Sequence, residues 1–458
     1  MIAGRLRPEN PTIMTKTLIT NALLVNEGRT EEGDLLIDGD RISKIAASIT
    51  ADASMTVIDA QGRVLMPGMI DDQVHFREPG APHKANMASE SVAAVAGGTT
   101  SFMDMPNTNP TTTTRQAVAD KYARAAGRVA ANYGFYLGAT NDNIDEIRAL
   151  KIDEACGVKV FMGASTGNML VDNQDALKAI FRDAPGLIAT HCEDTPTILR
   201  NEAEAIERYG DTLTAQMHPT IRSAEACWLS SSMAVGLARE YDARLHVLHL
   251  TTAREMELFD RGPIESKRVT AEACVHHLWF SEADYAQLGN LIKCNPAIKS
   301  ATDRAALRQA LLEDRLDVIA TDHAPHTREE KAQPYVKAPA GLPLVQTSLV
   351  SLLDHVNDGW LPLTTMVHKA CHAPALCYGV QERGYLREGY YADLTLANLD
   401  ATTTVTPESV LYHCGWSPYE GTTFRGRIDS TWVNGALAFD GKTVIRPDGG
   451  QRLRYGPV

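Results

Sequence analysis

The sequence has no long apolar run and no excess of positive charge. No segment approaches the roughly 18 apolar residues of a membrane-spanning helix. The first residues, MIAGRLRPENPTIM, lack the apolar core of a signal peptide. A formal net charge of −13 argues against a nucleic acid or an anionic membrane as partner, because both bind basic faces. We therefore expect a soluble protein that is not exported by the usual route, and the net charge says nothing about a small acidic substrate.

Cysteine is sparse, and the sequence contains no CxxC pair. The eight cysteines lie singly at positions 156, 192, 227, 274, 294, 371, 377 and 414. We interpret them as reduced thiols of a cytoplasmic protein rather than as a disulfide frame. Because Met14 begins the first strand-like segment, we expect residues 1–13 to form a disordered leader.

Both ends of the chain have a sequence pattern typical of short strands separated by turns. Examples are TLITNALLV (17–25), DLLIDGDRISKI (34–45), MTVIDAQGRVLMPG (55–68), YYADLTLANLD (390–400) and residues 421–445. Two small β-rich pieces at opposite ends of a chain can pair with each other. We therefore predict one composite β-sandwich domain formed by residues 1–66 and 388–458.

Between these ends, short apolar strands alternate with Ala-rich segments of helical period. Helices are predicted near 112–129 and 143–151, after the strands TTSFMDMP and YGFYLGAT. Alternating β and α over roughly 300 residues predicts a parallel sheet, and a closed (β/α)₈ barrel over residues 67–387 fits that length best. A doubly wound open sheet is the alternative, but no Gly-rich phosphate loop follows an early strand.

Metal-capable side chains recur where the apolar strands end. His75 follows VLMPGMIDDQV, His191 follows LIAT, and His249 closes LHVLH. Lys159 lies within GVKVFM, and Asp322 follows VIAT. In a (β/α)₈ barrel the carboxyl ends of the strands meet on one face, the usual place for catalysis. Since imidazole and carboxylate are ligands that Zn²⁺ prefers, this series predicts a zinc site.

Other histidines carry weaker signals. His246 lies three residues before His249 on the same predicted strand, so the two side chains point to opposite faces and only one can face the site. The adjacent His276 and His277 are conspicuous, but their spacing fixes no role. We interpret this pair as structural, or as groups that support the site from behind.

Seven short segments share a common resemblance. They are DDQVHFREPG (71–80), MPNTNP (105–110), GVKVFM (157–162), HCED (191–194), HVLHLT (246–251), NP (295–296) and ATDHAPH (320–326). In order and spacing they resemble the motifs of dihydroorotases, amidohydrolases related to hydantoinases and allantoinases. The resemblance covers nearly the full chain, and HFREPG and ATDHAPH are its specific parts. It implies a barrel with a split β-sandwich, and reversible hydrolysis of the cyclic amide of (S)-dihydroorotate to N-carbamoyl-L-aspartate in de novo pyrimidine (UMP) synthesis.

The resemblance also implies roles for individual residues. His75 and Asp322 resemble ligands of one metal, and His191 and His249 resemble ligands of a second. Lys159 resembles a lysine that related enzymes carboxylate, so that its carbamate bridges both metals; a carbamate forms only from the neutral amine. Asp322 resembles the catalytic base that later acts as acid. The residues that resemble substrate contacts are Arg77, Asn107, Asn295, His326, Ala340 and Gly341. A homo-oligomer, dimer or tetramer, is expected.

Gln73 departs from the family pattern, which has His-x-His at the first strand. A neutral amide oxygen is a weaker ligand for Zn²⁺ than imidazole. We therefore expect one tightly bound Zn²⁺, held by Lys159, His191 and His249, and a weaker second site. Asp72 is close enough along the strand to compensate for the missing histidine.

Two rival functions remain open at this stage. Hydantoinases and allantoinases share the barrel and the metal set, but their substrates lack the exocyclic carboxylate of dihydroorotate. Arg77 and Asn107 favour dihydroorotase over them. The other rival is an inactive homologue that serves as a scaffold for aspartate transcarbamoylase. Gln73 alone supports that function, since Lys159 and the other ligands remain.

Overall fold

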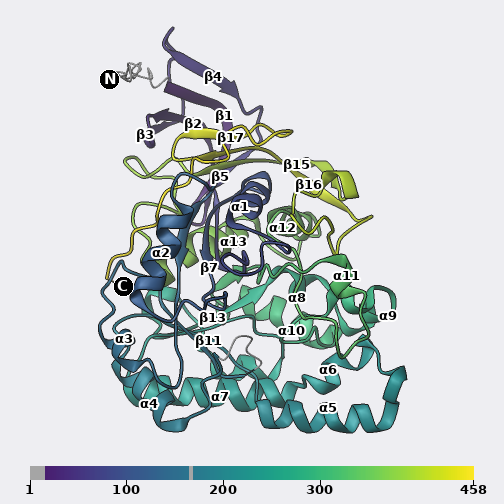
Figure 1. The fold of residues 1–458 in the computed structure, drawn as a ribbon. Helices are drawn as coiled ribbons and strands as arrows, with labels where there is room; N and C mark the ends of the chain where they lie inside the picture. Colours follow the sequence, from purple (N-terminus) through teal and green to yellow (C-terminus); the bar gives the residue numbers. More distant parts are fainter. Residues whose placement is uncertain (1–15, 164–168, 458) are drawn as a thin grey trace, which may run out of the picture.

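Strands from both ends of the chain form one sheet in the structure, a computed structural model that describes residues 16–163 and 169–457 (Figure 1). The eight-stranded sheet has the order β17-β16-β15-β5-β1-β2-β3, with β4 paired to β1. Its strands are β1 Lys16–Asn26, β2 Arg29–Asp38, β3 Arg41–Ala46, β4 Met55–Asp59, β5 Val64–Pro67, β15 Leu394–Thr404, β16 Thr423–Val433 and β17 Ala436–Phe439. β5 forms the seam between the two ends of the chain. Its Leu65 is in register with Leu24 of β1 on one side and with Leu396 of β15 on the other. The two β-rich ends therefore pair, whereas the predicted leader lies outside the described residues.

A buried polar network fixes this sheet to the rest of the molecule. Asp393, which precedes β15, accepts hydrogen bonds from Asn132 Nδ2 at 3.0 Å and from the backbone N–H of Asn434 at 2.8 Å. It also forms an ion pair with Arg383, and both side chains of that pair are 3% exposed. Asn132 belongs to a strand of the central body, so one carboxylate joins the terminal sheet to that body.

The middle of the chain supplies parallel strands. A six-stranded sheet has the order β14-β13-β12-β11-β10-β9, and a three-stranded sheet has the order β6-β7-β8. Their strands are β6 Met69–Val74, β7 Thr99–Asp104, β8 Asn132–Phe135, β9 Leu137–Gly138, β10 Val158–Phe161, β11 Ile188–His191, β12 Leu245–Val247, β13 Val269–Cys274 and β14 Val318–Ala320. Nearly all of these residues are buried, as expected for parallel strands covered on both faces. The two sheets adjoin, because only Tyr136 separates β8 from β9 and Val74 forms a parallel bridge to His323.

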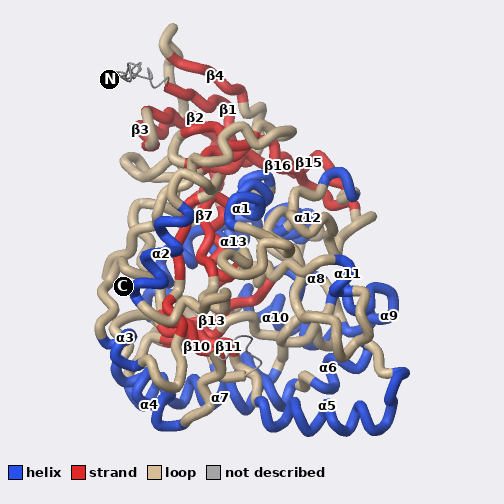
Figure 2. The backbone as a smooth tube through the Cα atoms, in the orientation of Figure 1, coloured by secondary structure: helices blue, strands red, loops and turns tan. Residues whose placement is uncertain are grey.

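Helices surround the parallel strands and lie apart from most of the terminal sheet (Figure 2). They are α1 Met87–Ala96, α2 Arg115–Ala125, α3 Ile144–Arg148, α4 Gln174–Asp183, α5 Thr195–Tyr209, α6 His218–Ile221, α7 Ala224–Tyr241, α8 Val275–Trp279, α9 Tyr285–Leu288, α10 Ala301–Leu312, α11 Arg328–Lys331, α12 Ser348–Asn357, α13 Leu363–Val367 and α14 Ala373–Tyr378. The predicted helices near 112–129 and 143–151 are present as the shorter α2 and α3. Among the helices of the described ranges, none has the length and apolar character to cross a membrane.

The side chains that precede the helices explain several of the helix starts. Asp194 accepts a hydrogen bond from the Thr197 N–H and begins α5 directly after β11. Ser300 and Asp303 form a capping box that begins α10. All eight cysteines are unpaired, which confirms the prediction of free thiols.

Replacing Asp393 tests the network at the seam. We expect Asp393→Ala to lower the free energy of unfolding by about 3–5 kcal/mol, because it leaves the Arg383 charge buried without its partner. Urea denaturation would measure the change, with Asp400→Ala, at an exposed position of β15, as the control. Equal, small changes in both variants would show that the ion pair does not hold the seam.

Candidate metal centre and active site

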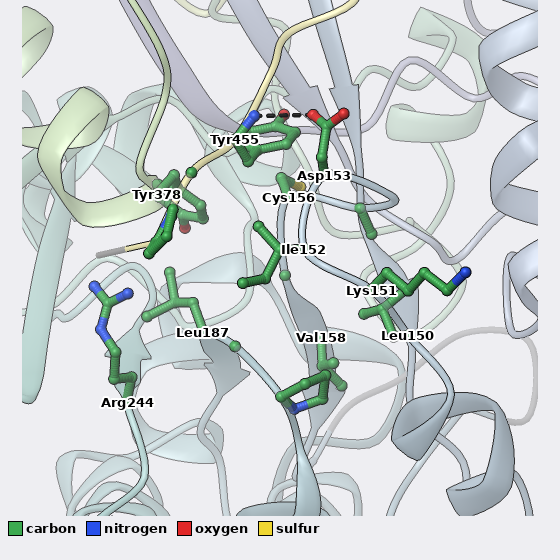
Figure 3. Close-up of a pocket in the computed structure, with 16 residues that line it drawn as sticks. Leu150, Lys151, Ile152, Asp153, Cys156, Val158, Leu187, Arg244, Tyr378 and Tyr455 are labelled. Carbon is green, nitrogen blue, oxygen red and sulfur yellow. Dashed lines mark hydrogen bonds between the residues drawn. The ribbon is translucent and has the colours of Figure 1, made fainter.

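Hollows open at both ends of the parallel strands. One lies at the amino ends of β10, β11 and β12 and is lined by Ile152, Leu187, Tyr378 and their neighbours (Figure 3). Its lining holds no histidine and a single carboxylate, Asp153, whose Oδ1 accepts the backbone N–H of Tyr455 at 2.9 Å. This hollow therefore lacks the ligand pairs of a metal centre.

The second hollow lies at the carboxyl ends of the strands and encloses about 190 Å³. It is lined by Gln73, His75, Arg77, Asn107, Lys159, Phe161, His191, His249, Asn295, Asp322, Ala324, His326, Pro339, Ala340 and Gly341. Every residue predicted for the site from the sequence is in this lining. Phe161, Ala324 and Pro339 complete the lining and were not predicted.

His75 and Asp322 form one half of the ligand set. His75 Nε2 lies 3.2 Å from Asp322 Oδ1, while His75 Nδ1 faces Asn107 Oδ1 at 2.8 Å. The Asn107 amide therefore directs the other ring nitrogen of His75 towards the carboxylate. Gln73 donates its Nε2 to the same Asp322 oxygen at 3.2 Å, and its Oε1 lies 3.9 Å from Cys274 Sγ. In this orientation Gln73 is a hydrogen-bond donor to Asp322 rather than a metal ligand.

His191 and His249 form the other half. His191 Nδ1 and His249 Nε2 face each other at 3.0 Å. Burial lowers the pKa of both imidazoles, so both are neutral at pH 7, the form that binds metal. Nδ1 of His249 is buried and has no hydrogen-bond partner among the described residues. Two neutral ring nitrogens at this separation fit a shared metal ion, because ligands at about 2.0–2.1 Å on a tetrahedral zinc lie about 3.3 Å apart.

Glu193 orients His191, a role that the sequence did not reveal. Its Oε2 lies 3.1 Å from His191 Nε2 and also forms an ion pair with Arg222. Although burial opposes ionisation, the Arg222 charge and the His191 hydrogen bond lower the pKa of Glu193 to about 2. Carboxylates commonly hold metal-binding imidazoles in this way. Its place two residues after His191, just beyond the end of β11, was the available signal.

Lys159 lies at the base of the hollow on β10 and is 1% exposed. Burial lowers the pKa of its amine to about 8, although the charges of Asp322 and Glu272 oppose the shift. A substantial fraction of the amine is therefore neutral near physiological pH. The neutral amine is the form that reacts with carbon dioxide to give a carbamate.

Three lining residues have left-handed backbone conformations that non-glycine residues rarely adopt. The φ angles are 63° at Arg77, 40° at His249 and 50° at Asp322. Such strain costs about 1–3 kcal/mol per residue and persists where the surrounding structure enforces it. Each of the three lies just beyond a strand end, so the turn of the chain directs its side chain into the hollow.

Arg77, His326 and Asn295 also line the hollow. Arg77 Nε donates to the carbonyl of Pro325 at 3.1 Å. His326 accepts from Lys84 at Nδ1 and faces the Ala340 carbonyl at 3.0 Å from Nε2. Asn295 Oδ1 is buried and lacks a hydrogen-bond partner among the described residues. That oxygen is available to a donor on a bound molecule.

The structure shows which of the remaining histidines face the hollow. His249 lines the hollow and His246 does not, so only one of the two faces the site. His276 and His277 are buried outside the lining, and His277 Nε2 faces the Pro296 carbonyl at 3.2 Å. Asp72 is also absent from the lining, so it does not replace the missing histidine there.

This chain is similar to known proteins over nearly its full length. The model of the amidohydrolase family matches residues 64–438. A curated dihydroorotase of Halobacterium salinarum is 34% identical over 445 residues, which cover 94% of this chain and 98% of that protein. A dihydroorotase of Methanosarcina acetivorans is 30% identical over 415 residues, or 88% of each chain.

Solved structures include similar folds. The L-hydantoinase (dihydropyrimidinase) from Arthrobacter aurescens has a TM-score of 0.89 at 27% identity, covering 96% of this chain and all of that chain. The dihydropyrimidinase from Brevibacillus agri has a TM-score of 0.86 at 24% identity, over 97% of this chain and 100% of that one. The second likeness concerns the fold alone.

The carboxylate behind His191 provides a test of the metal centre. We expect Glu193→Gln to weaken metal binding about 10–100-fold, because the amide no longer holds the imidazole with a charged acceptor. Competition with a chromophoric chelator would measure the affinity. Glu207→Gln, an exposed change on α5, should leave the affinity unchanged. Wild-type affinity in Glu193→Gln would mean that His191 does not depend on this carboxylate.

Proposed function

This chain belongs to the amidohydrolase family, and we propose that it reversibly hydrolyses the cyclic amide of (S)-dihydroorotate to N-carbamoyl-L-aspartate in pyrimidine synthesis. The observation that carries the proposal is the half-buried Arg77 guanidinium, which lines the same hollow as His75, His191 and His249. Burial lowers the pKa of Arg77 to about 10, so the group is still charged at neutral pH. A hydantoin offers it no carboxylate, whereas dihydroorotate does.

We propose that the parallel strands close into a (β/α)₈ barrel, with residues 67–387 as the catalytic domain and residues 1–66 and 388–458 as the composite β-sandwich. Two features support closure. The chain passes directly from β8 to β9, and the bridge from Val74 to His323 is reinforced by the His75 N–H, which donates to the His323 carbonyl at 2.7 Å. An open doubly wound sheet would leave two free edges at these positions.

The donor set of the hollow fits Zn²⁺. His191 and His249 would hold one ion together with the carbamate of Lys159, and His75 and Asp322 would hold a second, weaker ion. Bound zinc acidifies water and polarises the carbonyl of the substrate. His191 and His249 contribute by remaining neutral, and Lys159 contributes by its lowered pKa, which makes the carbamate accessible.

Residues of the chain supply binding and proton transfer. Arg77 pairs with the substrate carboxylate in two parallel hydrogen bonds. Asn295 Oδ1 accepts the N–H of the ring, while His326 and the backbone of Ala340 and Gly341 bound the other side. Asp322 takes a proton from the attacking water and delivers it to the ring nitrogen as the C–N bond breaks. The carboxylate is thereby restored at the end of each turnover.

Further proposals concern the oligomeric state, the location and an alternative function. A homo-oligomer, dimer or tetramer, and a cytoplasmic location suit the family and the free thiols. A purely scaffolding role beside aspartate transcarbamoylase is the second candidate, and Gln73 is its one support. His75, Lys159, His191, His249 and Asp322 all lie in one hollow, which favours catalysis over scaffolding.

Substrate choice tests the assignment to Arg77. We expect Arg77→Ala to raise KM for dihydroorotate at least 10-fold, because a charge-assisted contact contributes about 1.5–3 kcal/mol. Turnover of a hydantoin without a carboxylate, where detectable in wild type, should change little. Steady-state kinetics on both substrates would measure the difference. Equal losses would mean that Arg77 is structural and would remove the main support for dihydroorotate as substrate.

Metal content tests the assignment of Gln73. We expect Gln73→His to bind about one zinc more per chain than wild type, since imidazole replaces an amide that donates to Asp322 instead of binding metal. Both proteins would be dialysed together against a mild chelator and analysed by elemental mass spectrometry. Gln73→Leu, which adds no ligand, should not gain zinc. Equal zinc in wild type and Gln73→His would show that the second site is already filled.

A further inference from the structure

A second group of metal-capable side chains lies beneath the active-site hollow. Asp72 comes from β6, His246 from β12 and Glu272 from β13, and each is 0% exposed. None of the three lines the hollow at the carboxyl ends. The cluster is therefore separate from the site described above, although it lies within the same set of strands.

The distances in this cluster match the edges of a metal coordination sphere. His246 Nε2 lies 3.4 Å from Asp72 Oδ2 and 3.2 Å from Glu272 Oε2. The ligand atoms of all three residues lie within 4.8 Å of one another. Two ligands on a tetrahedral zinc lie about 3.3 Å apart. Direct charge-assisted hydrogen bonds are shorter, at about 2.7–2.9 Å.

The cluster has too few hydrogen-bond donors for its two carboxylates. His246 Nδ1 is engaged by Thr270 Oγ1 at 2.8 Å, so only Nε2 faces Asp72 and Glu272. Neither oxygen of Asp72 has a hydrogen-bond partner among the described residues. A buried carboxylate without donors is unfavourable unless a cation or a proton compensates it. The other oxygen of Glu272 accepts the backbone N–H of His249 at 3.0 Å.

A proton shared by the two acids is the competing explanation. Burial and the charge of Asp72 raise the pKa of Glu272 to about 8, so a proton is available to the pair. Although burial opposes the shift, contacts with Cys377, Asp72 and Glu272 raise the pKa of His246 well above its usual value, so a proton on this imidazole also competes with the ion. Either proton leaves the His246 contacts at 3.2 and 3.4 Å longer than direct charge-assisted hydrogen bonds. A cation between the three side chains accounts for all three at once.

We propose that Asp72, His246 and Glu272 bind a divalent transition-metal ion of the Zn²⁺ type, distinct from the metal of the active site. One imidazole and two carboxylates form a donor set that suits this ion. The ion would cross-link β6, β12 and β13 within the interior of the strands. Its positive charge would also compensate the carboxylate charge that the hydrogen-bond donors of the cluster do not neutralise.

The surroundings of the cluster close it to solvent. Tyr136 Oη donates to the Asp72 carbonyl at 2.8 Å and lies 2.7 Å from Tyr378 Oη. Tyr378 is a wall of the hollow at the amino ends of the strands (Figure 3), so these two rings separate that hollow from the cluster. A chelator has no open path to the ion. The ion should therefore be retained under conditions that empty the open active site.

Chelation followed by elemental analysis tests the proposal. The full chain, expressed with zinc, would be dialysed against a strong chelator and its zinc measured before and after unfolding in guanidinium. We expect about one equivalent to remain in the folded wild type and to be released on unfolding. Asp72→Asn should lose this chelator-resistant ion. Asp71→Asn, at the neighbouring and equally buried aspartate that accepts the Thr321 hydroxyl, should retain it.

Two results would overturn the proposal. Folded wild-type protein without chelator-resistant zinc would favour the shared proton, and a resistant ion that persists in Asp72→Asn would have to lie elsewhere. If Asp72→Asn does not fold, anomalous diffraction of wild-type crystals at the zinc edge decides the matter through a peak, or no peak, between the three side chains. None of these experiments measures turnover, so a failed activity assay would not affect the test.

Discussion

Ionisable side chains buried among parallel strands dominate the physical chemistry of this molecule. Asp322, Lys159 and His249 are each less than one-tenth exposed, where an unpaired charge is costly. The chain meets this constraint by placing carboxylates against imidazoles and by keeping His191 and His249 neutral. What results is a set of ligand atoms that face one another at about 3 Å. Imidazole and carboxylate atoms in such a set suit a bound Zn²⁺ ion.

The supporting groups follow from the same constraint. A metal-binding imidazole is useful only if its other nitrogen is held, and Glu193 and Asn107 do this for His191 and His75. The left-handed backbone at Asp322 adds conformational strain at the same place. Strain and buried charge both lower stability locally, and the apolar strands below compensate for them.

The terminal sheet contributes to the site from a distance. Its network around Asp393 fixes the start of β15 against β8, which belongs to the strands that carry the hollow. Hydrogen bonds to a buried carboxylate are directional, so this contact specifies one relative placement of the sheet and the strands.

Much of this was accessible from the sequence because it depends on local pattern. Period-2 segments at the two ends and alternating β and α between them predicted the pairing of the ends. Polar residues at strand ends predicted His75, Lys159, His191, His249 and Asp322, whereas the family resemblance supplied the other residues of the hollow. Tertiary structure alone decided the rest. The Gln73 amide faces Asp322, Glu193 reaches His191, and Asp72 joins His246 and Glu272, because each contact joins atoms whose positions depend on side-chain rotation or on strands far apart in the chain. Sequence spacing fixes which residues stand at a strand end, whereas the packing of neighbouring strands fixes where their polar atoms point.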